Sequence, residues 1–280
     1  MPSSKFLRSV ALALAVIATL AAHAEKDQPL WEAGVGVAGF SFPAYRGSDK
    51  VHNFLMPVPY FTYHGDFLKA DRHGYRAQLF DSDKVDLNLS LSASPPMKSD
   101  DVAVRAGMPN LKATVEFGPQ LDVKLWRSAD QARVLRLRLP MRAAFTAEHS
   151  PKSIGWVFSP NLNLDVSDLP GLPDWNFGFL AGPIYADRKQ HESFYGVSQQ
   201  YATVSRPAYA ASGGYSGSQF LASVSKRFDK TWFGAFARYD SLSGAAFENS
   251  PLVAKRSFAT VGFAFSWVLG ESSTRVAVDD

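Results

Sequence analysis

The stretch that decides the fold is VDLNLSLSA, residues 85–93, in which apolar and polar side chains alternate without a break. Val, Leu and Ala occupy the odd positions, and Asp, Asn and Ser the even ones. Successive residues of a β-strand point to opposite sides, so a period of two separates the two kinds of side chain. The stretch therefore predicts a strand with one apolar and one polar face.

The same alternation recurs along the chain, most clearly in residues 113–125, 135–142, 158–165 and 259–267. Weaker runs bring the expected number of strands to about twelve: 31–40, 54–63, 67–70, 75–80, 175–186, 219–228 and 232–239. Every second link is short and most of the others are long, which is the asymmetry of an outer-membrane barrel. The strands of a soluble β-sandwich also alternate between apolar and polar residues. The lumen of a barrel, however, accommodates polar strand faces with several charges more readily than a sandwich does. The expected fold is all-β, a transmembrane, antiparallel, up-and-down β-barrel.

The N-terminus predicts export. Lys5 and Arg8 precede an apolar run, residues 10–22, and the small-residue pattern Ala22-His23-Ala24 follows. This is the pattern of a secretory signal peptide, and the run is too short for a spanning helix. We expect a cleaved signal peptide at 1–24, then a barrel domain at 25–280 with a short polar tail from about 269. The expected location is the outer membrane of a Gram-negative cell, with its lipid as a partner.

Composition excludes several classes of function. Without Lys5 and Arg8 the chain has 27 basic and 26 acidic residues, a net charge of +1, and no basic tract is visible. Nucleic acid is therefore not an expected partner. The chain has no Cys, which rules out disulfides and thiolate metal sites. No histidine or carboxylate spacing predicts a metal site, and no cofactor is expected.

Prolines interrupt several of the expected strands. Three follow a small residue in a similar context: residues 117–119 (FGP), 158–160 (FSP) and 181–183 (AGP). Proline removes a donor from the ladder, so we expect a bulge or a sharp coil at one level of the wall to accommodate all three. This hypothesis leaves Pro57 and Pro59 unexplained.

Several short motifs, in this order along a signal-bearing chain, resemble the MipA/OmpV family of outer-membrane proteins. They are WEAGVG (31–36), PAYRGSD (43–49), PVPY (57–60), FGP (117–119), FYGVS (194–198), PAY (207–209) and NSPLV (249–253). The resemblance implies an outer-membrane barrel that acts as a scaffold, bringing a lytic transglycosylase and a penicillin-binding protein together in peptidoglycan synthesis. Other members of the family are porin-like or immunogenic. One departure is the polar tail after Trp267, where the family tends to end on an aromatic residue.

A charge cluster is expected in the lumen. Two adjacent strands carry charged residues on their polar faces: Arg136, Arg138 and Arg142 on one, and Glu116, Asp122 and Lys124 on the other. The cluster could line an anion-selective pore, or it could plug the lumen by pairing. Because charges removed from bulk water need partners, the ion-paired plug is favoured.

The long link 187–207 carries Phe194, Tyr195 and Tyr201. These aromatic residues are either a recognition surface or part of a loop folded into the barrel mouth. The histidines after the signal peptide fall in turns and loops, and none is expected beside a serine with a third catalytic member, so no catalytic site is expected. The leading function is a non-enzymatic scaffold for murein-synthesising and murein-cleaving enzymes, and the alternative is a small-solute channel.

Overall fold

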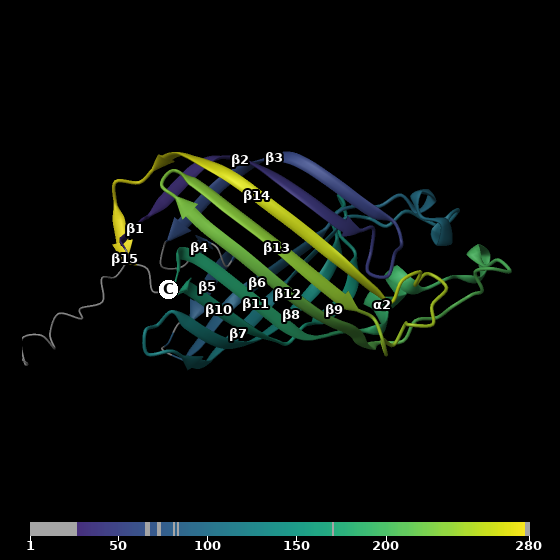
Figure 1. The fold of residues 1–280 in the computed structure, drawn as a ribbon. Coiled ribbons are helices and arrows are strands. Elements are labelled where there is room, and N and C mark those ends of the chain that lie inside the picture. Colours follow the sequence, from purple (N-terminus) through teal and green to yellow (C-terminus); the bar gives the residue numbers. More distant parts are fainter. Residues whose placement is uncertain are drawn as a thin grey trace, which may run out of the picture.

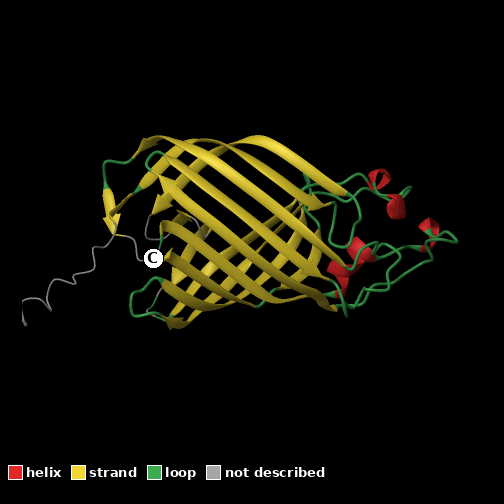
Figure 2. Ribbon diagram, viewed as in Figure 1, coloured by secondary structure: helices red, strands yellow, loops and turns green. Residues whose placement is uncertain are grey.

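The computed structural model describes residues 27–277 except 65–67, 72, 73, 81, 83 and 170. The expected signal peptide, residues 1–24, lies outside the described residues. The strands form one wall, with the short helices gathered at one of its ends (Figure 2). None of the helices in the described part of the chain is long and apolar enough to cross a membrane.

Fifteen strand segments occur in the described residues, together with helix α2 (Arg188–Tyr195) and three short 3-10 turns, η1 (Ser99–Asp101), η2 (Ala103–Arg105) and η3 (Gln199–Tyr201). The segments are β1 (Asp27–Pro29), β2 (Trp31–Pro43), β3 (Val51–His64), β4 (Leu68–Asp71), β5 (Gly74–Phe80), β6 (Val85–Ser94), β7 (Thr114–Arg127), β8 (Arg133–Thr146), β9 (Ser153–Phe158), β10 (Asn161–Leu169), β11 (Leu172–Ala186), β12 (Gly214–Phe228), β13 (Thr231–Ser241), β14 (Ser257–Glu271) and β15 (Arg275–Ala277).

The pairing is antiparallel and returns on itself. From β2 to β8 each strand pairs with the next along the chain, as do β11 to β14, and β14 pairs with β2. The strands β9 and β10 are two halves of one interrupted strand, because β8 and β11 each pair with both. Counted in this way, the described residues form twelve strands of an up-and-down barrel. The fold expected from alternation is confirmed, including the two short strands β4 and β5.

Prolines mark one level of the wall where pairing is interrupted. The β7–β8 ladder skips Gly118 and Pro119, the break between β9 and β10 falls at Ser159 and Pro160, and β11 shifts register just after Pro183. Backbones approach closely here: a Cβ on Gly118 would lie 2.0 Å from the Met141 carbonyl oxygen, and one on Gly182 2.1 Å from that of Pro160. The glycines before Pro119 and Pro183 are therefore required by the coil of the wall.

The barrel has an apolar outer face and a polar inner face. Large apolar side chains are exposed on the outside of every long strand, among them Val35, Leu91, Phe117, Met141, Phe158, Phe179, Phe220, Val261, Phe263 and Trp267. Polar side chains are buried inside, including Glu32, Asn88, Asp122, Asn163 and Asp240. A soluble protein has the opposite arrangement, whereas a transmembrane barrel presents an apolar band to lipid.

The two ends of the barrel differ. At the turn end, the strands are joined by short turns and the small sheet β1–β15 projects from the wall (Figure 1). The sequence did not indicate this sheet, and β14 continues to Glu271, so the expected polar tail begins within β14 and includes β15. At the loop end lie α2 and the long links (Figure 1).

The long links of the loop end pack together into one body, here called the loop cap, made of residues 44–50, 95–113, 187–213 and 242–256. Its buried cluster is Tyr45, Met97, Val102, Tyr195, Ala211, Leu242, Ala245 and Phe247. The rings of Tyr195 and Phe247 stack with centroids 3.6 Å apart. Hydrogen bonds across the links add to this packing: Tyr45 Oη donates to the Leu252 carbonyl, and Arg105 Nη1 to the Phe194 carbonyl. The loop cap therefore covers the mouth of the barrel with an ordered core of its own.

Candidate functional site

The lumen contains a layer of ion pairs built by β7, β8 and β10. Arg142 Nε lies 3.0 Å from Glu116 Oε2, and Arg136 Nη1 lies 2.5 Å from Asp165 Oδ2. Arg138 lies between these pairs: its guanidinium is 3.9 Å from both Asp122 and Asp165. The structure thus pairs five of the six predicted lumen residues in two groups: Arg136, Arg138 and Asp122 with the added Asp165, and Arg142 with Glu116.

Strand register explains this network. Asp122 faces Arg138 across the β7–β8 ladder, so their side chains start from neighbouring positions on the inner face. The same register places Lys124, the sixth predicted residue, opposite Arg136, beside a like charge. Polar neighbours complete the layer, because Arg138 Nη1 donates to Asn163 Oδ1 at 3.0 Å and Gln120 Nε2 to Asp122 Oδ1 at 2.8 Å.

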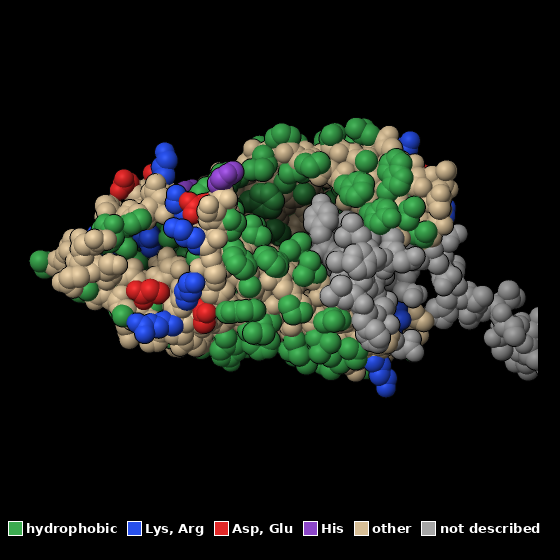
Figure 3. All heavy atoms as spheres, turned by 180° about the vertical axis from the view of Figure 1, so that it is seen from behind, with side chains coloured by type: hydrophobic (Ala, Val, Ile, Leu, Met, Phe, Trp, Pro, Cys, Tyr) green, Lys and Arg blue, Asp and Glu red, His purple; other side chains and the backbone are tan. Residues whose placement is uncertain are grey.

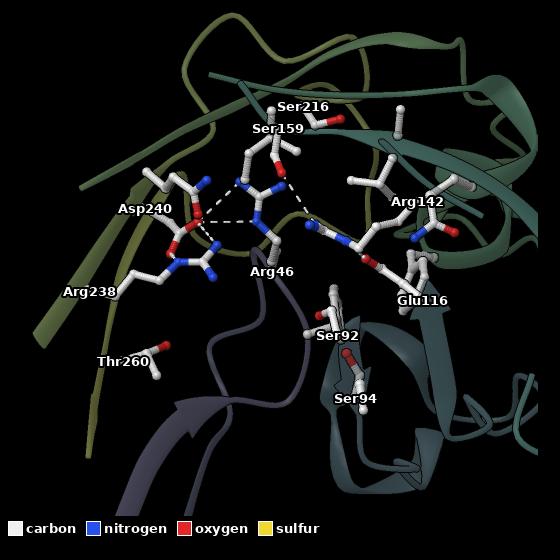
Figure 4. A pocket seen from close by; sticks show the side chains of 18 of the residues that line it. Arg46, Ser92, Ser94, Glu116, Arg142, Ser159, Ser216, Arg238, Asp240 and Thr260 are labelled. Carbon is white, nitrogen blue, oxygen red and sulfur yellow. Dashed lines mark hydrogen bonds and ion pairs between the residues drawn. The ribbon is translucent and has the colours of Figure 1, made fainter. Parts of the chain in front are cut away.

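A second ion cluster, which the sequence did not indicate, joins the loop cap to the opposite wall. Asp240 of β13 is only 1% exposed and accepts hydrogen bonds from Arg238 Nε and Nη2, both at 2.7 Å, and from Arg46 Nε at 3.3 Å (Figure 4). Arg238 and Asp240 are two residues apart on one strand, which puts both on the inner face. Arg46 arrives from the loop cap, so no local sequence pattern could have placed it here.

Between the two clusters lies a chamber of about 640 Å³ (Figure 4). It extends from Tyr45, Tyr195 and Phe247 of the loop cap down to Arg138. Its charged lining is Arg46, Lys112, Arg138, Arg142 and Arg238 against Glu116 and Asp240. When the groups paired with this lining are also counted, namely Glu148, Asp122, Asp165 and Arg136, six cations stand against five anions, an excess of one with His191 neutral. The excess lies at Asp240, which Arg46 and Arg238 share. The chamber is therefore electropositive and suits an anionic group.

His191 of α2 fastens the loop cap to β12. Its Nε2 lies 2.5 Å from Ser216 Oγ and its Nδ1 2.5 Å from the Ser212 carbonyl oxygen. The carbonyl can only accept, so Nδ1 carries the proton and Ser216 donates to Nε2. Burial lowers the pKa of His191, and the charge of Arg46 lowers it further, which keeps the ring neutral. His191 thus lies beside a serine, which its place in a long link did not indicate, but the group that orients the ring is a backbone carbonyl and not the third side chain of a catalytic triad.

The three aromatic residues proposed as a recognition surface lie in the loop cap. Tyr195 is 5% exposed and its Oη donates to the Arg46 carbonyl, so it cannot meet a partner. Burial raises the pKa of Tyr195 well above its usual range, which keeps the hydroxyl a donor. Phe194 packs against the same cluster, and Tyr201 is half-buried in η3. Tyr195 is therefore part of the buried core of the loop cap, whereas Phe194 and Tyr201 remain partly exposed.

The described residues hold no group of three or more His, Asp or Glu side chains that could bind a metal ion. Fold and lumen together define the class: a transmembrane β-barrel whose mouth is covered and whose inner wall carries ion pairs. The model of the family MltA-interacting protein MipA matches residues 35–269, and the chain belongs to this family.

Two similar proteins are the outer membrane protein OmpV of Vibrio cholerae serotype O1 and the outer membrane protein Omp26La of Vibrio anguillarum. Each is 27% identical over 229 residues, which cover 80% of this chain and 80% of the relative. A solved structure described as a bacterial polysaccharide outer membrane secretin is 9% identical and has a TM-score of 0.44, covering 85% of this chain and 99% of that one. That likeness is too loose to bear on function.

The network predicts the effect of removing its central cation. Replacing Arg138 with Ala deprives the buried Asp122 of a nearby positive charge, and we expect a loss of about 1–3 kcal/mol in the free energy of unfolding in detergent. The matched control is Arg133→Ala on the same strand, because the pair that Arg133 makes with Asp130 at 3.8 Å is exposed and such pairs contribute little. An Arg138→Ala barrel as stable as the control would contradict an ion-paired plug.

Proposed function

We propose that this chain is a non-enzymatic scaffold of the bacterial outer membrane, exported by a cleaved signal peptide, which brings murein-cleaving and murein-synthesising enzymes together. The partners would be a lytic transglycosylase and a penicillin-binding protein. The family description, MltA-interacting protein, supports a protein partner. The names of the two Vibrio relatives support the location.

One observation carries the proposal: the long links pack into a loop cap over one mouth of the barrel. Below the loop cap, Arg142 and Arg136 project from the inner face of the wall and pair with Glu116 and Asp165 of the neighbouring strands. A covered mouth opposes the passage of bulk solute, and we therefore assign partner binding to the ends of the barrel. Murein enzymes work in the periplasm, and short turns face the periplasm in outer-membrane barrels, so the turn end is the surface that we assign to them.

The turn end offers an ordered platform. The small sheet β1–β15 is fixed to the wall, since Leu30 N–H donates to the Thr274 carbonyl at 2.9 Å and His64 N–H to the Leu30 carbonyl at 2.8 Å. The turn between β7 and β8 is rigid as well, because Asp130 accepts from Ser128 Oγ and from the Ala132 N–H. A pre-ordered surface loses little entropy when a partner binds.

The absence of Cys from the sequence makes a direct test possible. A single cysteine is placed at exposed Ala129 of the turn end or at exposed Val204 of the loop cap, and each is labelled after folding with a bulky maleimide. Capture of a purified lytic transglycosylase should fall at least tenfold with the label at position 129 and stay unchanged with the label at 204. Equal capture by both labelled proteins would refute the turn-end scaffold.

The chamber of about 640 Å³ is the observation that favours the second candidate, a small-solute channel. Planar-bilayer recording of the unmodified protein separates the two functions. The scaffold predicts no steady single-channel current. A steady current with anion preference, together with no capture of the transglycosylase, would establish the channel instead.

A further inference from the structure

The wall of the barrel is open on one side. β3 pairs with β2 from Val51 to Tyr63, but on its other edge it pairs with β4 only at Tyr63 and His64. Similarly, β6 pairs with β7 along its whole length but with β5 only at Leu87 and Asn88. Among the described residues, the facing edges 51–62 of β3 and 89–94 of β6 therefore have no strand partner.

The hairpin β4–β5 between these edges is too short to fill the wall. Its described strands have four and seven residues, against 14 in β3. The hairpin pairs with the ends of β3 and β6 nearest the turn end, so the opening lies in the half of the wall nearer the loop cap. The back of the barrel has a hollow with a mostly hydrophobic border (Figure 3).

The open edge also accounts for Pro57 and Pro59. The two residues lie two positions apart, so their nitrogens face the same side of β3. The ladder with β2 continues through both, and proline is tolerated in a sheet where its nitrogen faces a free edge. An edge without strand partners is otherwise costly in lipid, unless it borders a water-filled cavity.

The lumen chamber reaches this opening. Its lining includes Ser92 and Ser94, on the inner face of β6, and also Leu91 and Ala93, on the outer face. In the register with β7, Ser92 faces Glu116 and Leu91 faces Phe117, which confirms that these neighbours point to opposite sides. Because consecutive residues from both faces line the chamber, the chamber extends to the backbone of β6 at the edge that has no described strand partner.

The border of the opening on β3 is apolar on the inner face. Phe54 and Met56 share the inner face with Tyr60, which reaches the buried Glu32, and they are 40% and 41% exposed. Phe42 of β2 stacks on Phe54 with ring centroids 5.5 Å apart and lines the chamber. This apolar patch fits a hydrocarbon chain and not a solvated ion.

We propose that the opening between β3 and β6 is a lateral portal, through which an anionic amphiphile with one acyl chain passes between the membrane and the lumen chamber. The loop cap covers the aqueous mouth, so the membrane is the accessible source. The chain lies along Phe54, Met56 and Leu91. The anionic head enters the electropositive chamber, where Arg142 reaches β6 by donating to Ser90 Oγ at 3.3 Å. A volume of about 640 Å³ lies within the usual range for one small ligand.

The test uses the whole barrel in lipid nanodiscs, because a detergent is itself an amphiphile. Binding of radiolabelled dodecanoate is measured at equilibrium, with empty nanodiscs to subtract partitioning into lipid. Met56→Cys is labelled after folding with a bulky maleimide, so that folding is not at issue, and Val204→Cys labelled in the same way is the control. We expect the label at 56 to weaken binding at least tenfold relative to the unlabelled Met56→Cys variant, while the labelled Val204→Cys control binds as the unmodified chain does.

Competition identifies the ligand class. Unlabelled dodecanoate should displace the probe at least tenfold better than a dodecyl ammonium cation or acetate, and better than a two-chain anionic phospholipid. Dodecanoate binding that is unaffected by the label at 56, or displacement by acetate as strong as by dodecanoate, would overturn the portal. Capture of the transglycosylase should not change when position 56 is labelled, so the portal and the scaffold can fail separately.

Discussion

Replacing Asp240 with Ala is expected to lower the free energy of unfolding by about 3 kcal/mol and to loosen the loop cap. The carboxylate is 1% exposed and pairs with two guanidinium groups, that of Arg238 on its own strand and that of Arg46 from the loop cap. Breaking a buried ion pair leaves an uncompensated charge, which costs about 3–5 kcal/mol. The lower end applies because the arginine side chains are 26% and 31% exposed and can be partly hydrated.

Two measurements check this expectation. Chemical unfolding gives the loss of stability, and limited proteolysis reports on the loop cap, which should be cut faster once Arg46 has lost its partner on the wall. The matched control is Glu148→Ala, because Glu148 also pairs with a cation, Lys112 at 3.0 Å, but in solvent. No measurable change is expected there. If both variants lose the same stability, or if proteolysis of the loop cap is unchanged in Asp240→Ala, then Asp240 does not hold Arg46 and the loop cap to the wall.

Alternation was sufficient to predict the wall because each strand has one face in lipid and one in the lumen, and a strict period of two records both. It failed for β1 and β15, which have three residues each. Three residues are too few to show alternation. In addition, β1 and β15 lie near opposite ends of the sequence, so no local pattern indicates that they pair. The loop cap is a similar case, because its cluster is assembled from four separate links and has no local signature.

The lumen network could be predicted only in part. Arg142 and Glu116 belong to neighbouring strands with clear alternation, so their side of the wall followed from the sequence. Asp240 lies one residue beyond the end of the expected strand 232–239, and its partner Arg46 lies in a loop 194 residues away. Distances of this kind depend on closure of the barrel, which local patterns do not encode.

The sequence alone could not explain Pro57 and Pro59, because it does not show how they relate to the short strands that follow them. The prolines and the short neighbouring strands 67–70 and 75–80 are both apparent in the sequence. Only the register shows that the short hairpin leaves the edge of β3 free along the stretch that contains both prolines. The two prolines, which are unusual inside a barrel strand, are therefore explained by the opening beside β3.

Replacing Phe263 with Arg is expected to destabilise the barrel by about 2–4 kcal/mol, the cost of a cation on the lipid face near the middle of the membrane. Phe263 lies near the centre of β14 and is 48% exposed on the apolar outer face. Its ring also covers the backbone at Gly39, where a Cβ would lie 2.5 Å from the Phe263 ring. The substitution would thus remove this cover as well as place a charge in lipid.

The control for this prediction is Thr260→Arg on the same strand. Thr260 lines the chamber (Figure 4), where an added guanidinium can remain hydrated. Both variants are unfolded in lipid vesicles, because the penalty at position 263 requires a bilayer and should shrink in detergent. A loss confined to Phe263→Arg and to vesicles fits an outer face in contact with lipid. Equal losses at both positions would mean that the two faces of β14 have been assigned wrongly, and with them the transmembrane orientation of the whole wall.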